Sequence, residues 1–87
     1  MIIKIFKRQY YTMFDYDYYI PLNNNKILAI NKNDIFNDYD VRIFRSRKLS
    51  NKIIKISIND NLYKMLLSED MTIVNMGVNI IIKKYII

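Results

Sequence analysis

The chain has no cysteine and no histidine, and it has only one glycine and one proline among its 87 residues. The absence of cysteine excludes disulfides, thiolate nucleophiles, zinc fingers and iron–sulfur sites. The absence of histidine removes the commonest general base of enzymes. We therefore expect a protein that is not an enzyme, with no catalytic residues and no cofactor.

Long apolar runs and grouped carboxylates are also missing. The longest aliphatic run, Ile80–Ile82, is far shorter than the ~20 residues of a membrane-spanning helix. The N-terminal segment meets a charge every few residues, unlike a secretory signal. The spacing of Asp34, Asp38 and Asp40 does not match a calcium loop, and no glycine permits the sharp turn of that loop. The sequence thus predicts no metal site, no membrane partner and no small-molecule substrate.

Positive charge is what the chain has in excess. Lys and Arg number 14 against 8 acidic residues, a formal net charge of +6, and 52% of residues are hydrophobic. A single small domain with this surplus attracts polyanions, namely RNA, DNA or an anionic membrane surface. Ile, Asn, Lys and Tyr supply more than half of the residues, which indicates AT-rich codons such as those of reduced plastid genomes or large viruses.

Alternation of apolar and polar residues predicts five short strands in the first 58 residues. Between residues 12 and 20, this alternation places Phe14, Tyr16, Tyr18 and Ile20 on one side, which we expect to face the core. The following Asn-rich segment predicts a hairpin turn, because Asn tolerates left-handed backbone angles. The other expected elements are strands around Ile3 and Ile5 and at 26–30, 41–44 and 53–58, a polar loop at 31–40, and a basic connection at 45–52.

The C-terminal part supports two interpretations. Asn59 fits a turn or a helix N-cap before a short helix at 62–67. Residues 72–87 alternate as a strand would, and we favour a strand there. The same residues also carry a helical stripe of Val74, Val78, Ile81 and Tyr85. We predict a small barrel or curled sheet over residues 1–58 and an extension over residues 59–87 that packs on it or projects from it.

The strongest candidate site is a run of basic residues between residues 42 and 55, with Ser and Asn interleaved. Arg forks match phosphate oxygens, and hydroxyls and amides add neutral hydrogen bonds. The alternative is a solvated basic face without a partner. A second basic group, Lys4, Lys7 and Arg8, precedes two tyrosines that either stack on bases or lie in the core. The predicted RNA contacts are Lys7, Arg8, Arg42, Arg45, Arg47, Lys48, Ser50, Lys52 and Lys55.

The segment 41–52 resembles the small-subunit ribosomal protein seventeen family, in which a Val-x-Ile strand precedes Arg-Pro-Leu-Ser and a lysine-rich stretch. Lys48 stands where that family has Pro, and Asn51 where it usually has Lys. The resemblance covers residues 3–58 and implies a mainly β protein with a five-stranded OB-like barrel. It further implies ribosomal RNA and neighbouring ribosomal proteins as partners, in a ribosome of a plastid or similar organelle. The residues in register are Val41, Ile43, Arg47, Leu49 and Ser50, and the implied RNA contacts are Arg42, Arg45, Arg47, Ser50 and Lys52.

Three other interpretations remain open. Residues 54–86 resemble a ribbon-helix-helix DNA-binding regulator, in which Lys55 and Ser57 would face the major groove and residues 72–86 would be helical. Gly77–Ile80 resembles a signature of Sm-like RNA-binding barrels. The third is a small, non-enzymatic protein-interaction module, for which a virus is one candidate source.

Overall fold

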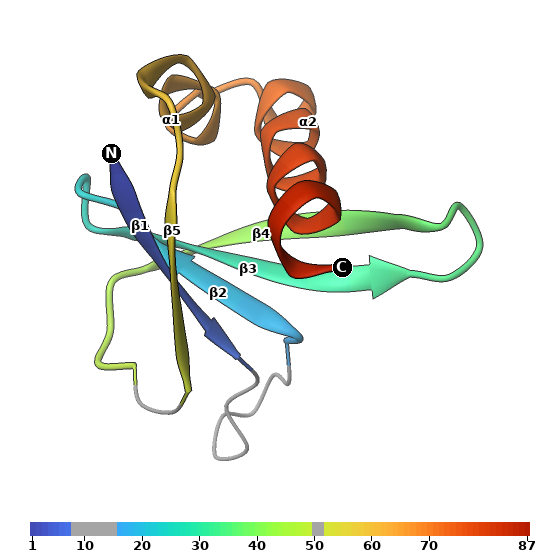
Figure 1. Ribbon diagram of the computed structural model, residues 1–87, viewed down its shortest axis with the longest axis horizontal. Helices are drawn as coiled ribbons and strands as arrows, with labels where there is room; N and C mark the ends of the chain where they lie inside the picture. Colours follow the sequence, from blue (N-terminus) through green and yellow to red (C-terminus); the bar gives the residue numbers. More distant parts are fainter. Residues whose placement is uncertain (8–15, 50–51) are drawn as a thin grey trace.

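The computed structural model describes residues 1–7, 16–49 and 52–87, in which strands precede helices along the chain (Figure 1). The mainly β class, with five strands, is confirmed. The elements are β1 (Ile2–Lys7), β2 (Tyr18–Pro21), β3 (Lys26–Asn33), β4 (Asp38–Arg45), β5 (Ile53–Ser57), α1 (Asp60–Leu66), α2 (Met71–Ile81) and a terminal π-helix, η1 (Ile82–Ile86).

The strands form one antiparallel sheet in the order β4-β3-β2-β1-β5. The first four strands are neighbours in chain order, and β5 returns to pair with β1. Within the described residues no ladder joins β4 to β5, so the hydrogen-bonded pairing does not close the sheet into a ring. Pro21 is the last residue of β2, and Asn25 has a positive φ of 62°, as the predicted hairpin requires.

The polar segment 31–40, expected to be a loop, instead continues the β3–β4 hairpin. The ladder runs through Asn31↔Asp40 to Asn33↔Asp38, and only residues 34–37 form the turn. Polar residues occupy these pairs because the hairpin here extends past β2, whose last partner on β3 is Ile30. A strand shows alternating apolar and polar residues in its sequence only where one of its faces is buried. Much of that buried face is missing in this part of the hairpin, so the alternation is missing as well.

Two helices cover one face of the sheet, which we call the helix face (Figure 1). Asn59 caps α1 as predicted, its side chain accepting a hydrogen bond from the Leu62 amide at 2.7 Å. The core under the helices is the larger of the two apolar clusters of the described residues, and residues 59–87 therefore pack on the sheet. Its buried members are Ile3, Ile5, Ile20, Leu22, Leu28, Ile30, Tyr39, Val41, Ile58, Leu62, Tyr63, Leu66, Val74, Val78, Ile81 and Ile82.

Residues 71–86 are helical, so the favoured strand interpretation of this segment was wrong. Val74, Val78 and Ile81 of the expected helical stripe are fully buried, whereas its fourth member, Tyr85, is exposed, as are Met76 and Ile80. Asp70 caps α2 by accepting from the Thr72 amide at 2.9 Å. Packing of an amphipathic stripe on the sheet outweighs the modest helix propensity of the β-branched residues.

Gly77, the one glycine, lies buried at the contact between α1 and α2. A Cβ there would lie 3.1 Å from Met65 Cβ and 3.3 Å from Leu66 Cδ2. Its small size therefore permits the close approach of the helices, which offsets the ~1 kcal/mol that glycine costs within a helix. The Gly77–Ile80 segment, which resembles an Sm-like signature, lies inside α2, and its glycine serves this packing.

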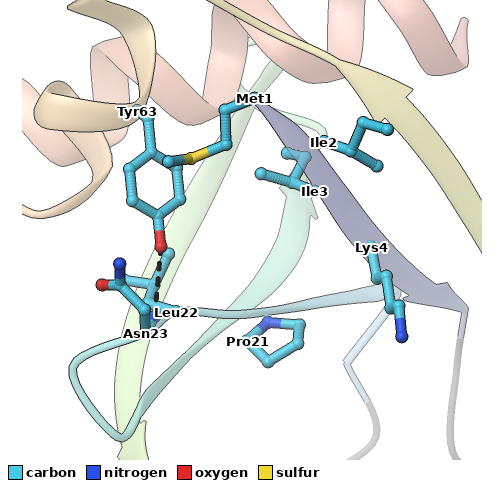
Figure 2. A pocket seen from close by; sticks show the side chains of 8 residues that line it. All are labelled: Met1, Ile2, Ile3, Lys4, Pro21, Leu22, Asn23 and Tyr63. Atoms are coloured by element: carbon cyan, nitrogen blue, oxygen red, sulfur yellow. Dashed lines mark hydrogen bonds between the residues drawn. The ribbon is translucent and has the colours of Figure 1, made fainter. Parts of the chain in front are cut away.

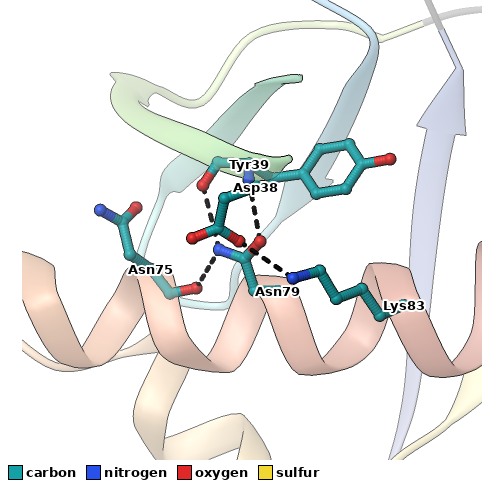
Figure 3. Close-up of polar contacts among 5 residues, drawn as sticks. All are labelled: Asp38, Tyr39, Asn75, Asn79 and Lys83. Carbon is teal, nitrogen blue, oxygen red and sulfur yellow. Dashed lines mark hydrogen bonds and ion pairs between the residues drawn. The ribbon is translucent and has the colours of Figure 1, made fainter. Parts of the chain in front are cut away.

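Asn79 of α2 joins the helix to the outer edge of β4 (Figure 3). Its carboxamide accepts from the Tyr39 amide at 2.8 Å and donates to the Tyr39 carbonyl at 3.0 Å, so it pairs with both backbone groups of one residue. It also donates to the Asn75 carbonyl at 2.8 Å. Lys83 lies 3.4 Å from the Asp38 carboxylate on the same edge. These contacts cover part of an edge strand that would otherwise expose backbone groups.

The opposite side of the sheet, which we call the loop face, carries a second and smaller cluster. Phe6, Tyr16, Tyr19, Ile27 and Ala29 are buried in it, and Phe44 and Leu49 pack against them. Tyr16 and Tyr19 were predicted on opposite sides of one strand but lie together here, with ring centroids 5.9 Å apart. Tyr18 packs on the helix face as expected, and Phe14 lies outside the described residues.

Candidate nucleic-acid interface

The register of the sheet places basic side chains directly opposite one another at three positions. Lys4 pairs with Lys55 across β1 and β5. Three residues further along β1, the Lys7 amide donates to the Lys52 carbonyl at 3.1 Å, which places these two residues opposite each other. Lys26 pairs with Arg45 across β3 and β4. Like charges facing each other across strands destabilise a sheet, so an external anion would relieve each pair.

The basic connection after β4 begins beside the turn that joins β2 to β3. The Ser46 amide donates to the Asn25 carbonyl at 2.8 Å, which fixes the start of the connection beside the β2–β3 turn. The Arg47 guanidinium lies 5.4 Å from the centre of the Phe44 ring, and Leu49 packs into the loop-face cluster. The connection is therefore anchored by apolar contacts while its charges stay exposed.

The predicted contact residues divide between two positions. Arg42 and Lys55 point to the loop face, since they pair with Ala29 and Lys4, and the Arg47 guanidinium lies on the same side, over Phe44. Arg8 and Ser50 lie outside the described residues. The remaining predicted contacts are exposed at the ends of strands or in the connection: Lys7, Arg45, Lys48 and Lys52.

Sequence reasoning missed Lys26 and left Lys4 out of the predicted contacts. Both residues join the interface only through their cross-strand partners, Arg45 and Lys55. The signal that could have found them is a basic residue on each of two strands at matching distances from the turn or connection, which requires the register to be known.

Negative charge gathers elsewhere on the structure. Asp34, Asp38 and Asp40 lie at the far end of the β3–β4 hairpin. Among the described residues, ion pairs join Lys32 to Asp34 at 3.9 Å and Lys83 to Asp38. Within residues 1–7, 16–49 and 52–87, the basic residues of the interface take part in no ion pair. These residues are Lys4, Lys7, Lys26, Arg42, Arg45, Arg47, Lys48, Lys52 and Lys55.

A cleft of about 390 Å³ opens beside Lys4, and Figure 2 shows the side chains that line it. The ladder between β1 and β2 covers only Phe6↔Tyr19 and Lys7↔Tyr18. Continuing that register would set Lys4 opposite Pro21, which has no N–H to donate to a ladder. The ladder has already ended at Phe6↔Tyr19, and side chains of both strands and α1 line the gap beyond it. The lining residues are Met1, Ile2, Ile3, Lys4, Pro21, Leu22, Asn23 and Tyr63.

The described residues carry little that would support metal binding or a membrane span. No group of carboxylates there is arranged to hold a metal ion, and no helix there is long and apolar enough to cross a membrane. Burial raises the pKa of Tyr18 and of Tyr39, with a smaller contribution to each from the Asp17 carboxylate. Both tyrosines are neutral at pH 7 and belong to the core.

The ribbon-helix-helix interpretation correctly expected a strand followed by two helices at the C-terminus. In that family the strand pairs with the same strand of a second chain. Here β5 pairs along its whole length with β1 of its own chain, so one of its two edges is already occupied. Comparison with protein-family models, curated proteins and solved structures gave no match to this chain.

Proposed function

We propose that this protein is a structural RNA-binding protein that grips the phosphate backbone with the exposed cations of β1, β5 and the connection after β4. The observation that carries this proposal is the set of three cross-strand cation pairs without an ion pair among the described residues. Such pairs cost folding free energy in the isolated protein. A polyanion that neutralises them recovers this cost on binding.

Anchoring of the connection supports the same proposal. Phe44 and Leu49 hold the connection against the sheet, so Arg45 and Arg47 are presented from a fixed backbone. A pre-positioned guanidinium loses less conformational entropy on binding a phosphate than one on a free tail. Within this proposal, membership of the small ribosomal subunit is the specific setting that the resemblance of residues 3–58 implies.

The test measures RNA binding by a triple variant that carries Arg45→Ala, Arg47→Ala and Lys52→Ala. Binding is measured as the fluorescence anisotropy of a labelled single-stranded RNA at salt concentrations from about 50 to 200 mM. We expect affinity at least tenfold weaker at the lowest salt. Each lost phosphate contact lowers the log–log salt slope by about 0.7, so three contacts lower it by about 2. Circular dichroism verifies that the variant is folded.

The matched control removes the same charge from other surfaces: Lys32→Ala, Lys64→Ala and Lys84→Ala. We expect this variant to bind RNA with nearly the parental affinity and slope. Equal binding by the two triple variants would reject the basic connection as the contact surface. Co-sedimentation with ribosomal small subunits tests the ribosomal setting, and duplex DNA and anionic vesicles, as competitors, test the other two polyanions.

A further inference from the structure

The cleft between β1 and β2 combines an apolar lining with a cationic rim. Tyr63 closes its inner side, where its hydroxyl accepts a hydrogen bond from the Asn23 amide at 3.1 Å (Figure 2). Ile2 is 70% exposed, and Pro21 is half-buried on the facing strand. No acidic residue lines the cleft. A suitable ligand is therefore a compact apolar or aromatic group that carries a negative charge beside it.

Lys4 gives this cleft its charge. Its side chain lines the cleft, and Lys55 pairs with it on β5, on the side of β1 away from the cleft, so a second ammonium group lies next to Lys4. The exposed side chain of Asn23 adds an amide that can both donate and accept hydrogen bonds. Bases in single-stranded RNA are unstacked and free to enter such a site, with their phosphates a few ångströms away.

We infer that this cleft binds one unstacked nucleobase of a single-stranded RNA, while Lys4 and Lys55 hold the adjoining phosphate. The inference rests on the proposed function and narrows it: the RNA is read at one position by base insertion, in addition to the phosphate contacts of the basic connection. A volume of about 390 Å³ accommodates a base with its ribose. The base would lie between Ile2 and Pro21, with its polar edge toward Asn23.

The first experiment uses protein labelled with ¹³C in its methionine methyl groups. Met1 lines the cleft, whereas Met71 and Met76 lie exposed on α2 and serve as internal references. A short oligouridine is compared with the same oligonucleotide in abasic form, which keeps every phosphate. We expect the Met1 signal to shift with the base-bearing RNA alone, and the Met71 and Met76 signals to stay in place with both.

The outcomes separate the two proposals. If both RNAs bind with equal affinity and the Met1 signal responds identically to both, base insertion is overturned and phosphate binding stands. If neither RNA binds, both proposals fall. A Met1 shift caused by a short apolar peptide with acidic residues, and not by RNA, would also overturn the inference and assign the cleft to a protein partner.

The second experiment changes the lining without changing charge. Ile2→Ser removes an exposed apolar side chain from the cleft, and Ile35→Ser makes the same change on the distant hairpin turn, where Ile35 is 87% exposed. We expect Ile2→Ser to weaken binding of base-bearing RNA at least fivefold and to leave abasic RNA unaffected. Ile35→Ser should change neither affinity. Equal effects of Ile2→Ser on both RNAs would contradict insertion of a base.

Discussion

The two faces of the sheet differ in what occupies them. The helix face packs an extensive apolar core under α1 and α2, whereas the loop face carries five buried residues with cations around them. Along β3 the faces alternate residue by residue, with Ile27 on the loop face and Leu28 on the helix face. The difference indicates that stability comes mainly from one face, and that the other face can hold charge at the expense of stability.

The largest effect should come from truncating adjacent core residues on the two faces. Leu28→Ala removes a fully buried side chain under the helices, where the packed core cannot close the cavity, and should cost about 2 to 5 kcal/mol of unfolding free energy. Ile27→Ala removes a side chain that is almost as completely buried, but from the smaller cluster of the loop face, where fewer buried apolar residues surround it. We expect a smaller loss, measured by urea denaturation; equal losses would refute the contrast between the faces.

A smaller effect, of opposite sign, is expected on the loop face. Lys55→Glu turns the Lys4–Lys55 pair into an opposite-charge pair and should raise unfolding free energy by about 0.2 to 1 kcal/mol. The same change should weaken RNA binding several-fold, because a carboxylate replaces a phosphate-binding cation. Thermal denaturation and anisotropy together measure this trade-off.

Lys64→Glu is the control for that prediction, since Lys64 is exposed on α1 and belongs to none of the cation pairs of the sheet. It alters net charge equally and should leave RNA affinity nearly unchanged. Loss of stability in Lys55→Glu would mean that repulsion between Lys4 and Lys55 does not destabilise the folded sheet, which would contradict the prediction.

The smallest effect concerns alkaline pH and the helix face. Burial, reinforced by negative charge at Tyr18, Asp17 and Asp34, raises the pKa of Tyr39 above its ordinary value of 10.0. The folded state therefore favours the neutral phenol. This contribution to stability is complete below pH 10 and is lost as pH rises through the folded-state pKa. Between pH 9 and 11, unfolding free energy should fall more for the parent protein than for Tyr39→Phe; parallel curves would contradict the prediction.

Much of the sheet could be predicted from local pattern. Ile3 and Ile5, the Asn-rich turn and the Asn59 cap all carry their structural signal in a few adjacent residues. The segment 72–87 could not be settled in that way, because its β-branched residues satisfy both periods. Burial of Val74 and Val78 against the sheet decides it, and that surface exists only after the strands have paired.

The candidate site was predicted in part. The run of basic residues from Arg42 to Lys55 is recognisable in the sequence by its charge density. The basic residues of this run that the structure describes are exposed. The pairing of Lys26 with Arg45 and of Lys4 with Lys55 depends on register, which no single strand reveals. The cleft lies where the ladder between β1 and β2 stops after Phe6↔Tyr19, and this end of the pairing is likewise not visible in either strand alone.

The two hydrogen bonds between the Asn79 side chain and the Tyr39 backbone have a consequence for handling the protein. The amide and carbonyl of Tyr39 on the edge strand already hydrogen-bond to this side chain. They therefore cannot pair with a strand of another molecule that would extend the sheet at this point. Transient release of α2 would remove that protection and uncover the apolar core surface beneath it. Self-association during expression or concentration should therefore begin from molecules whose last helix has come away.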